Sequence, residues 1–357
     1  MDSVKFVEWL KRENLFDTVN NNYNHFINVL KKSLNVSREQ VLLVGDLGYP
    51  TRRLPALMLG GYLLAAKRMG LNYKLVIQDP IQRGGEASDQ VVESLLNLPN
   101  YGVIIFSLSG KPGSLGIIGS SYRKFARSHG HRFVSSTGLG DIKTSNFKDI
   151  VNSINVDFDK MRARAEQIKK AMDMGSEIKV ITDSGTNLTF DIKLKSAISN
   201  DANYINPGTG GNIPAGEVYI PPRKIGINGT AIIDGCSRNL HGTLLAKTPI
   251  KMRIEDGVVT SINGGEEAKA LEDSLKWAEE HARYPWGIRR IGELGIGINP
   301  GARIVDSTLI SEKTLGSAHI ALGSNYWFGG TVYAIIHLDQ VFRNPKIWID
   351  GERLEIK

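Results

Sequence analysis

Before residue 155, apolar and polar positions follow two different spacings along the chain. Short apolar runs of strand length are separated by longer stretches with helical spacing, which lie at 18–34 and 55–69. The strand-like runs lie at 40–45, 74–78, 103–107 and 132–136. Strands that alternate with helices are typical of βαβ units, whose strands run parallel. The pattern therefore predicts a mainly parallel α/β domain over residues 1–155.

A charged helix is predicted next, and the pattern changes after it. Residues 157–174 carry an apolar stripe, and Gly175 follows at a position where helices commonly end. The stripe consists of Met161, Ala165, Ile168 and Met172. We expect residues 156–175 to form a helix that connects two domains.

Residues 176–357 are predicted to form a β-rich α+β domain. Strand-like segments separated by glycine and asparagine turns lie at 177–182, 188–192, 231–236, 250–255 and 258–262. One helix is expected at 264–283. The residues that can carry chemistry all lie in this second part, so we expect it to be the catalytic, metal-binding domain.

The composition is that of an ordinary globular protein. Of 357 residues, 41% are hydrophobic and 23% are charged, and the length allows two domains with cores. The single cysteine, Cys236, excludes an internal disulfide and suits a reducing compartment. Residues 1–16 lack the apolar core of a signal peptide, and no apolar run approaches the ~20 residues of a membrane-spanning helix. We expect a cytoplasmic protein with no membrane partner.

The net charge of +7 does not by itself indicate a nucleic-acid partner. Basic residues occur as isolated pairs without interleaved aromatic residues, at 31–32, 52–53, 169–170 and 289–290. Dispersed positive charge mainly favours solubility and weakly attracts anions. We therefore expect no nucleic-acid binding. The carboxylates of substrates are anions that such a charge could attract.

Side chains that can bind metals are concentrated toward the carboxyl end. His319, Tyr326, His337 and Asp339 follow one another closely. In an extended segment, His337 and Asp339 project from the same side of a strand and can reach one ion together. An imidazole with a carboxylate suits zinc, manganese, cobalt or ferrous iron. A structural histidine is the alternative interpretation of the His-x-Asp pair taken alone.

Two glutamates lie in settings that are costly for a charge. Glu217 follows a run of glycines and a proline at 210–216, and Glu293 lies in the glycine-spaced apolar run 291–298. A buried carboxylate needs a cation or hydrogen bonds to compensate for its lost hydration. An ordinary surface position is the alternative for either glutamate alone.

Four spaced motifs contain these residues. They are Gly-Asn-x-Pro-x-Gly-Glu at 211–217, Glu-x-Gly-x-Gly-x-Asn-Pro at 293–300, Glu-Lys-x-x-Gly-x-x-His-x-Ala-x-Gly at 312–323 and His-x-Asp at 337–339. In this order they resemble the aminopeptidase T family of dinuclear metallo-aminopeptidases. The resemblance spans about residues 207 to 342, and weaker similarity extends forward to 185–190.

The resemblance implies a site for two divalent ions, zinc, cobalt or manganese, that hydrolyses small peptides with a free N-terminus. The metal ligands it implies are Glu217, Glu293, His319, Tyr326, His337 and Asp339. It also implies a catalytic role for Tyr326 and a homodimer. Glu312, beside Lys313 in the third motif, is a candidate catalytic acid/base or ligand-supporting group, with an exposed ion pair as the alternative.

A single ferrous ion is the main alternative to two divalent ions. His319, His337 and Asp339 alone make the set of two imidazoles and one carboxylate that non-haem ferrous oxygenases use. The aminopeptidase T proteins also resemble the ring-cleaving dihydroxypyridine dioxygenases, and residues 328–331 depart from the more polar linker expected of the peptidases. Glu217 and Glu293 raise the ligand count and favour two ions and hydrolysis. A nonenzymatic small-molecule binding protein is a third hypothesis, because a fold does not fix function.

Overall fold

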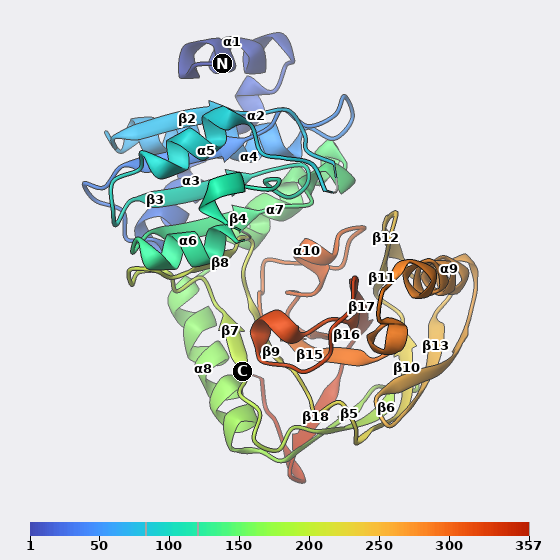
Figure 1. Ribbon diagram of the computed structural model, residues 1–357. Coiled ribbons are helices and arrows are strands. Elements are labelled where there is room, and N and C mark those ends of the chain that lie inside the picture. Colours follow the sequence, from blue (N-terminus) through green and yellow to red (C-terminus); the bar gives the residue numbers. More distant parts are fainter. Residues whose placement is uncertain (83, 120, 357) are drawn as a thin grey trace. The chain divides into compact units, whose positions relative to one another are not determined.

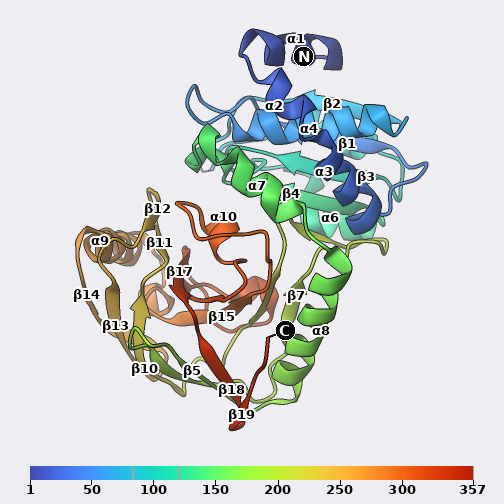
Figure 2. The same cartoon turned by 180° about the vertical axis from the view of Figure 1, so that it is seen from behind.

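The computed structural model describes residues 1–82, 84–119 and 121–356, which form two compact units (Figures 1 and 2). The first unit contains Met1–Phe158 and Ala202–Ala215. The second contains Asp159–Asp201 and Gly216–Lys357. The sequence pattern predicted two domains joined by one connecting helix, whereas in the structure the chain returns to the first unit for a short segment.

The first unit is built on a parallel sheet of five strands. The strand order is β2-β1-β3-β4-β8, and each neighbouring pair is parallel. The bounds are β1 Val41–Gly45, β2 Tyr73–Ile77, β3 Val103–Ser107, β4 Arg132–Ser136 and β8 Gly210–Asn212. Every residue of β1, β3 and β4 is buried, which explains the apolar runs of β1 and β3, whereas β4 also buries Arg132, Ser135 and Ser136.

Helices cover both faces of this sheet, with α5 and α6 on one face and α4 and α7 on the other (Figures 1 and 2). The helices of the unit are α1 Ser3–Arg12, α2 Phe16–Asn20, α3 Tyr23–Asn28, α4 Leu54–Arg68, α5 Asp89–Leu96, α6 Tyr122–Ser128 and α7 Phe147–Ile154. Alternate strand residues such as Leu42 and Phe106 pack in one core with Val91 of α5 and Phe125 of α6. The predicted fold class, a parallel α/β domain followed by a β-rich domain, is confirmed.

Two expectations about local structure are corrected. The amphipathic run 18–34 is not one helix, because α2 ends at Asn20 and α3 begins at Tyr23. The side chain of Asn22 donates to the backbone carbonyl of Thr18 at 2.8 Å, and such local bonds compete with helix continuation. The strand β8 was not predicted, since three residues rich in glycine carry no apolar pattern. A Cβ on Gly210 would lie 2.4 Å from the carbonyl oxygen of Phe133, so glycine permits this close pairing.

The second unit contains two antiparallel sheets of seven strands each. The first has the order β14-β13-β10-β6-β5-β18-β19. Its strands are β5 Glu177–Ile181, β6 Asn187–Asp191, β10 Ile227–Ile233, β13 Ile250–Glu255, β14 Val258–Asn263, β18 Lys346–Ile349 and β19 Glu352–Arg353. The helices of the unit are α8 Phe158–Met174, α9 Glu266–His281 and α10 Thr308–Ser311.

The second sheet carries the candidate site and has the order β12-β11-β17-β16-β15-β9-β7. Its strands are β7 Ile198–Asn200, β9 Glu217–Ile220, β11 Cys236–Asn239, β12 Gly242–Leu245, β15 Ile291–Gly297, β16 Ser317–Gly323 and β17 His337–Arg343. The strand predicted at 231–236 is in fact the end of β10 and the start of β11, which belong to different sheets. A Cβ on Gly235, between them, would lie 2.7 Å from the carbonyl oxygen of Val341, so glycine permits the chain to pass there.

No helix among the described residues is long and apolar enough to span a bilayer.

Gly61 tests the packing of the helices in the first unit. A Cβ on this α4 residue would lie 2.4 Å from the ring of Phe26 in α3. Gly61→Ala should therefore lower the free energy of unfolding by about 1–3 kcal/mol, although Gly→Ala inside a helix ordinarily stabilises by about 0.5–1 kcal/mol. Denaturant unfolding measures the change. In a Phe26→Leu background the same substitution should cost much less, and a stabilising effect of Gly61→Ala alone would contradict the close packing.

Candidate metal centre

Four neighbouring strands of the second sheet bring the predicted ligands together. Glu217 begins β9, Glu293 lies in β15, His319 in β16, and His337 and Asp339 in β17. Because side chains alternate along a strand, His337 and Asp339 share one face of β17, as the sequence predicted.

Small residues leave room between the ligands. Ala321 pairs with Glu293 on one side and with Asp339 on the other, so only a methyl group lies between two carboxylates. Gly295 pairs with His319, and a Cβ on Gly295 would lie 2.1 Å from Cε1 and 2.3 Å from Nε2 of the imidazole. The glycine spacing of β15 therefore makes space for the histidine ring.

Glu293 lies between the two imidazoles. Its Oε1 is 3.1 Å from Nε2 of His319, and its Oε2 is 3.4 Å from Nε2 of His337. On the far side of His337, Oδ1 of Asp339 is 3.1 Å from the same Nε2. Neighbouring ligands on one ion, each about 2.0–2.2 Å from the metal, are separated by roughly 3 Å. The distances and the donor types therefore fit divalent metal binding.

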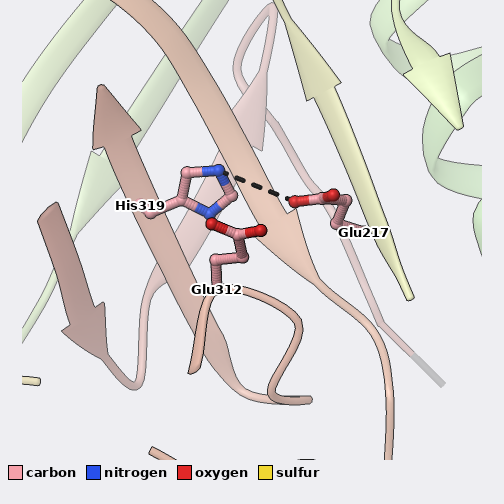
Figure 3. A group of neighbouring side chains, drawn as sticks. All are labelled: Glu217, Glu312 and His319. Carbon is pink, nitrogen blue, oxygen red and sulfur yellow. Dashed lines mark ion pairs between the residues drawn. The ribbon is translucent and has the colours of Figure 1, made fainter. Parts of the chain in front are cut away.

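A second group of possible metal ligands lies around the imidazole of His319 (Figure 3). Donor atoms of Glu217, Glu312 and His319 all lie within 4.8 Å of one another and could hold a metal ion. Oε2 of Glu217 is 3.9 Å from Nε2 of His319. Glu312, the candidate acid/base residue, thus lies beside the predicted ligands.

Lys313 is a component of the site that sequence reasoning missed. Its side chain is fully buried, with Nζ 3.2 Å from Oε1 of Glu217 and in contact with Glu312. Asn200 of β7 donates to the same oxygen of Glu217 at 3.0 Å. The exposed Glu312–Lys313 pair that the sequence allowed is not observed. A lysine next to a glutamate ordinarily indicates a surface pair, so nothing local identified this one as buried.

Tyr326 lies apart from the other predicted ligands. It belongs to a short turn after β16, and 68% of its surface is exposed. Its ring contacts that of Tyr333 at 6.3 Å between centroids. The structure therefore brings together Glu217, Glu293, His319, His337 and Asp339, and the ligand and catalytic roles of Tyr326 stay predictions.

Backbone contacts orient His337. Its Nδ1 lies 2.8 Å from the carbonyl oxygen of Ser324, so this nitrogen donates, and in the neutral imidazole the lone pair that can bind a metal is on Nε2. The neighbouring Asn325 is buried, donates to the carbonyl of Gly292 at 2.8 Å and accepts from the backbone N–H of Val332 at 2.8 Å. These contacts attach the loop after β16 to β15. The loop residues Ser324 and Asn325 were also missed, since nothing in their sequence distinguishes them from ordinary turn residues.

The carboxylates of the site change the protonation of the two imidazoles. Burial disfavours the charged form of both imidazoles, but neighbouring carboxylates outweigh it and raise the pKa of His319 to about 9 and of His337 to about 10. Glu293 is the main carboxylate near His319, and Asp339 is the main one near His337. The carboxylates therefore favour positive charge at both imidazole positions, which a bound cation could supply in place of the imidazole protons.

Burial affects the carboxylates differently. It raises the pKa of Glu312 to about 8, even though Lys313 acts to lower it. Burial also acts to raise the pKa of Glu217 and of Asp339, but nearby positive charge has the larger effect, and both pKa values are lowered. Lys313 dominates at Glu217, and His337 dominates at Asp339.

Comparison with known proteins identifies the family. A model of the 2,5-dihydroxypyridine 5,6-dioxygenase family matches residues 153–356, more than half of the chain and all of the candidate site. The chain belongs to the 2,5-dihydroxypyridine 5,6-dioxygenase family. A 2,5-dihydroxypyridine 5,6-dioxygenase from Pseudomonas putida is 26% identical over 155 residues, which are 41% of this chain and 43% of that protein.

Two solved structures share the fold. The 2,5-dihydroxypyridine dioxygenase from Pseudomonas putida has a TM-score of 0.72 at 16% identity and covers 95% of this chain and 96% of its own. AmpT from Thermus thermophilus has a TM-score of 0.60 at 13% identity, covering 97% of both chains. The predicted resemblance to aminopeptidase T is thus supported by fold, whereas the family shown is that of the related dioxygenases. Together the findings support a metal-dependent enzyme.

Gly295→Ala tests the space reserved for His319. The added methyl group would displace the imidazole, and we expect the affinity for divalent metal to fall about 10- to 100-fold while the fold is retained. Metal titration followed by elemental analysis measures the loss. In a His319→Ala background, Gly295→Ala should have no further effect on metal affinity. Metal binding as tight as in the unmodified protein would show that the ring does not need this position.

The imidazoles also predict how pH affects the metal-free protein. Their pKa values in the folded state, about 9 and 10, exceed the ordinary 6.5. Their contribution to stability is therefore fully present below about pH 6.5 and is lost as pH rises through 9 to 10. Denaturant unfolding of chelator-treated protein should show this decline. His337→Gln should flatten it, and an equal decline in that variant would contradict the assignment.

Proposed function

We propose that the protein is a two-ion metallohydrolase that releases the N-terminal residue of short peptides. The observation that carries the proposal is the position of Glu293, which directs one carboxylate oxygen to each imidazole. Each imidazole has its own further carboxylates: Glu217 and Glu312 beside His319, and Asp339 beside His337. Glu217, Glu293, Glu312 and His319 could hold one divalent ion, and Glu293, His337 and Asp339 could hold a second.

The count of charges is compatible with one or two ions, depending on Glu312. Glu217, Glu293, Glu312 and Asp339 supply carboxylates, and Lys313 supplies a positive charge. While Glu312 is protonated, one divalent ion would neutralise the site, whereas with all four carboxylates ionised one ion would leave it negative. Two divalent ions with one hydroxide would neutralise it, because the imidazoles bind metals in their neutral form.

The chemistry of such a site matches peptide hydrolysis. Two bound zinc, cobalt or manganese ions would activate a water molecule and polarise a carbonyl group. In the protein, Lys313 holds Glu217 and Glu312 in place, and Ser324 orients His337. Glu312, with a pKa raised by burial to about 8, can accept a proton and return it near neutral pH, which suits general acid/base catalysis.

Ring-cleaving dioxygenation is the second candidate function, and membership of the dihydroxypyridine dioxygenase family favours it. In that case His319, His337 and Asp339 would hold one ferrous ion, the ligand set of many non-haem iron oxygenases. The two functions differ in the number of ions and in the role of Glu217, which a single iron does not require.

Metal content distinguishes the two functions. We expect two zinc, cobalt or manganese ions per chain after loading and dialysis, measured by elemental analysis. Glu217→Gln should keep the shape of the side chain, reduce the content toward one ion and lower peptidase activity about 10- to 100-fold. The exposed Glu255, paired with Arg253, provides a matched control, and Glu255→Gln should change neither quantity. A content of one iron per chain that Glu217→Gln leaves unchanged would favour the oxygenase.

Substrate assays test the reaction directly. An ion that binds a free α-amine would hold the first peptide carbonyl beside the activated water, so acetylated peptides should be poor substrates. The assay compares free and acetylated forms of the same short peptides and, in parallel, oxygen uptake with 2,5-dihydroxypyridine. Equal rates of cleavage for free and acetylated peptides, or oxygen uptake without release of an N-terminal residue, would overturn the proposed function.

A further inference from the structure

The candidate metal centre is reached from the side of His337. The His337 side chain is 22% exposed, whereas those of Glu217 and Glu293 are 7% exposed and that of His319 is 1% exposed. Asp339, beside His337, is 14% exposed. Glu312 is 13% exposed, so His337 is the most exposed of these side chains and its side offers the most open approach to the ligands.

Aromatic side chains line this approach. The Trp327 ring lies 5.0 Å from the ring of His337, and the Phe328 ring lies 6.2 Å from it. Phe328 also contacts Tyr219 edge to face at 5.3 Å and Trp327 at 5.4 Å. Tyr219 lies two residues after Glu217 on β9, so both point to the same face of the sheet. We call Tyr219, Trp327 and Phe328 the aromatic wall.

The aromatic wall is held by the loop that orients His337. Asn325 bonds to Gly292 and Val332, and its backbone carbonyl accepts from Gly330 at 3.0 Å. A Cβ on Gly330 would lie 1.9 Å from the amide group of Asn325, so glycine allows the loop to close this tightly. The loop is thus shaped before substrate binds, and this lowers the entropic cost of binding.

Trp327 is nevertheless 64% exposed. A large indole surface left in water beside a metal centre gains free energy when a flat apolar group covers it, and aromatic rings gain a further contribution from their quadrupoles. The neighbouring His337 is a metal-ligand candidate, so a ring on the indole would lie next to the reacting groups.

We propose that the aromatic wall binds an aromatic ring of the substrate next to His337. The inference rests on the proposed function, under which the ring is the first side chain of a peptide that begins with phenylalanine or tyrosine. The pyridine ring of the second candidate function has the same flat chemistry. A ring site of this kind favours aromatic over small first residues because only the former can cover the indole.

Calorimetric binding to the metal-loaded protein tests this inference without turnover. L-Phenylalaninamide and L-alaninamide both offer a free amine, but only the first has a ring. We expect the first to bind about tenfold more tightly, and Trp327→Ala should remove that preference by weakening phenylalaninamide alone about tenfold. Trp286 is also exposed but contacts Arg290 instead, so Trp286→Ala is the matched control and should leave both affinities unchanged.

Each outcome of the binding experiment has a distinct meaning. Equal affinities for the two amides, equal weakening of both by Trp327→Ala, or no binding of either amide or of 2,5-dihydroxypyridine would overturn the aromatic wall as a ring site. Preference for phenylalaninamide that depends on Trp327, in a protein that releases no N-terminal residue, would retain the ring site and reject the proposed function. Binding of 2,5-dihydroxypyridine without oxygen, dependent on Trp327 while phenylalaninamide fails to bind, would retain the ring site and assign it to a pyridine.

Discussion

The structure around the candidate site depends on the compensation of buried negative charge. Glu217, Glu293 and Asp339 lie on one face of an antiparallel sheet where water has little access. An unpaired buried carboxylate costs several kcal/mol, so this concentration persists only with positive partners. Lys313 supplies one such partner, and the raised pKa values of the imidazoles show that protonated His319 and His337 supply the others in the metal-free protein. A divalent ion bound by the same imidazoles would replace their protons as the compensating charge.

Strand register provides the geometry that this compensation requires. Glycine and alanine at the positions paired with His319, Glu293 and Asp339 leave the space in which side chains from three strands converge. A larger residue at any of these positions would separate the ligands or push them toward solvent. The same strands continue into the loop held by Asn325, so the orientation of His337 and the presentation of the aromatic wall have a common structural basis.

Relatives with different named activities share this fold. The scaffold is compatible with 2,5-dihydroxypyridine dioxygenation in one solved protein and is also that of AmpT, so the fold alone does not decide the reaction. In this chain the features that support the proposed two-ion site are local. Glu293 is placed between two imidazoles, Glu217 and Glu312 extend one side of the cluster, and aromatic side chains border its accessible edge.

The sequence by itself determined the fold class, the main strands of the parallel sheet, the long helices α4, α8 and α9, and five ligand candidates that converge. Apolar spacing is a local property, and a glutamate in a glycine-spaced apolar run already implies compensation. Only the tertiary structure decided that Glu293 lies between the imidazoles, that Lys313 is buried, that Tyr326 is exposed, and that residues 202–215 return to the first unit. These features follow from the pairing of strands far apart in the chain, and a change of one residue in register would reverse the face of every side chain.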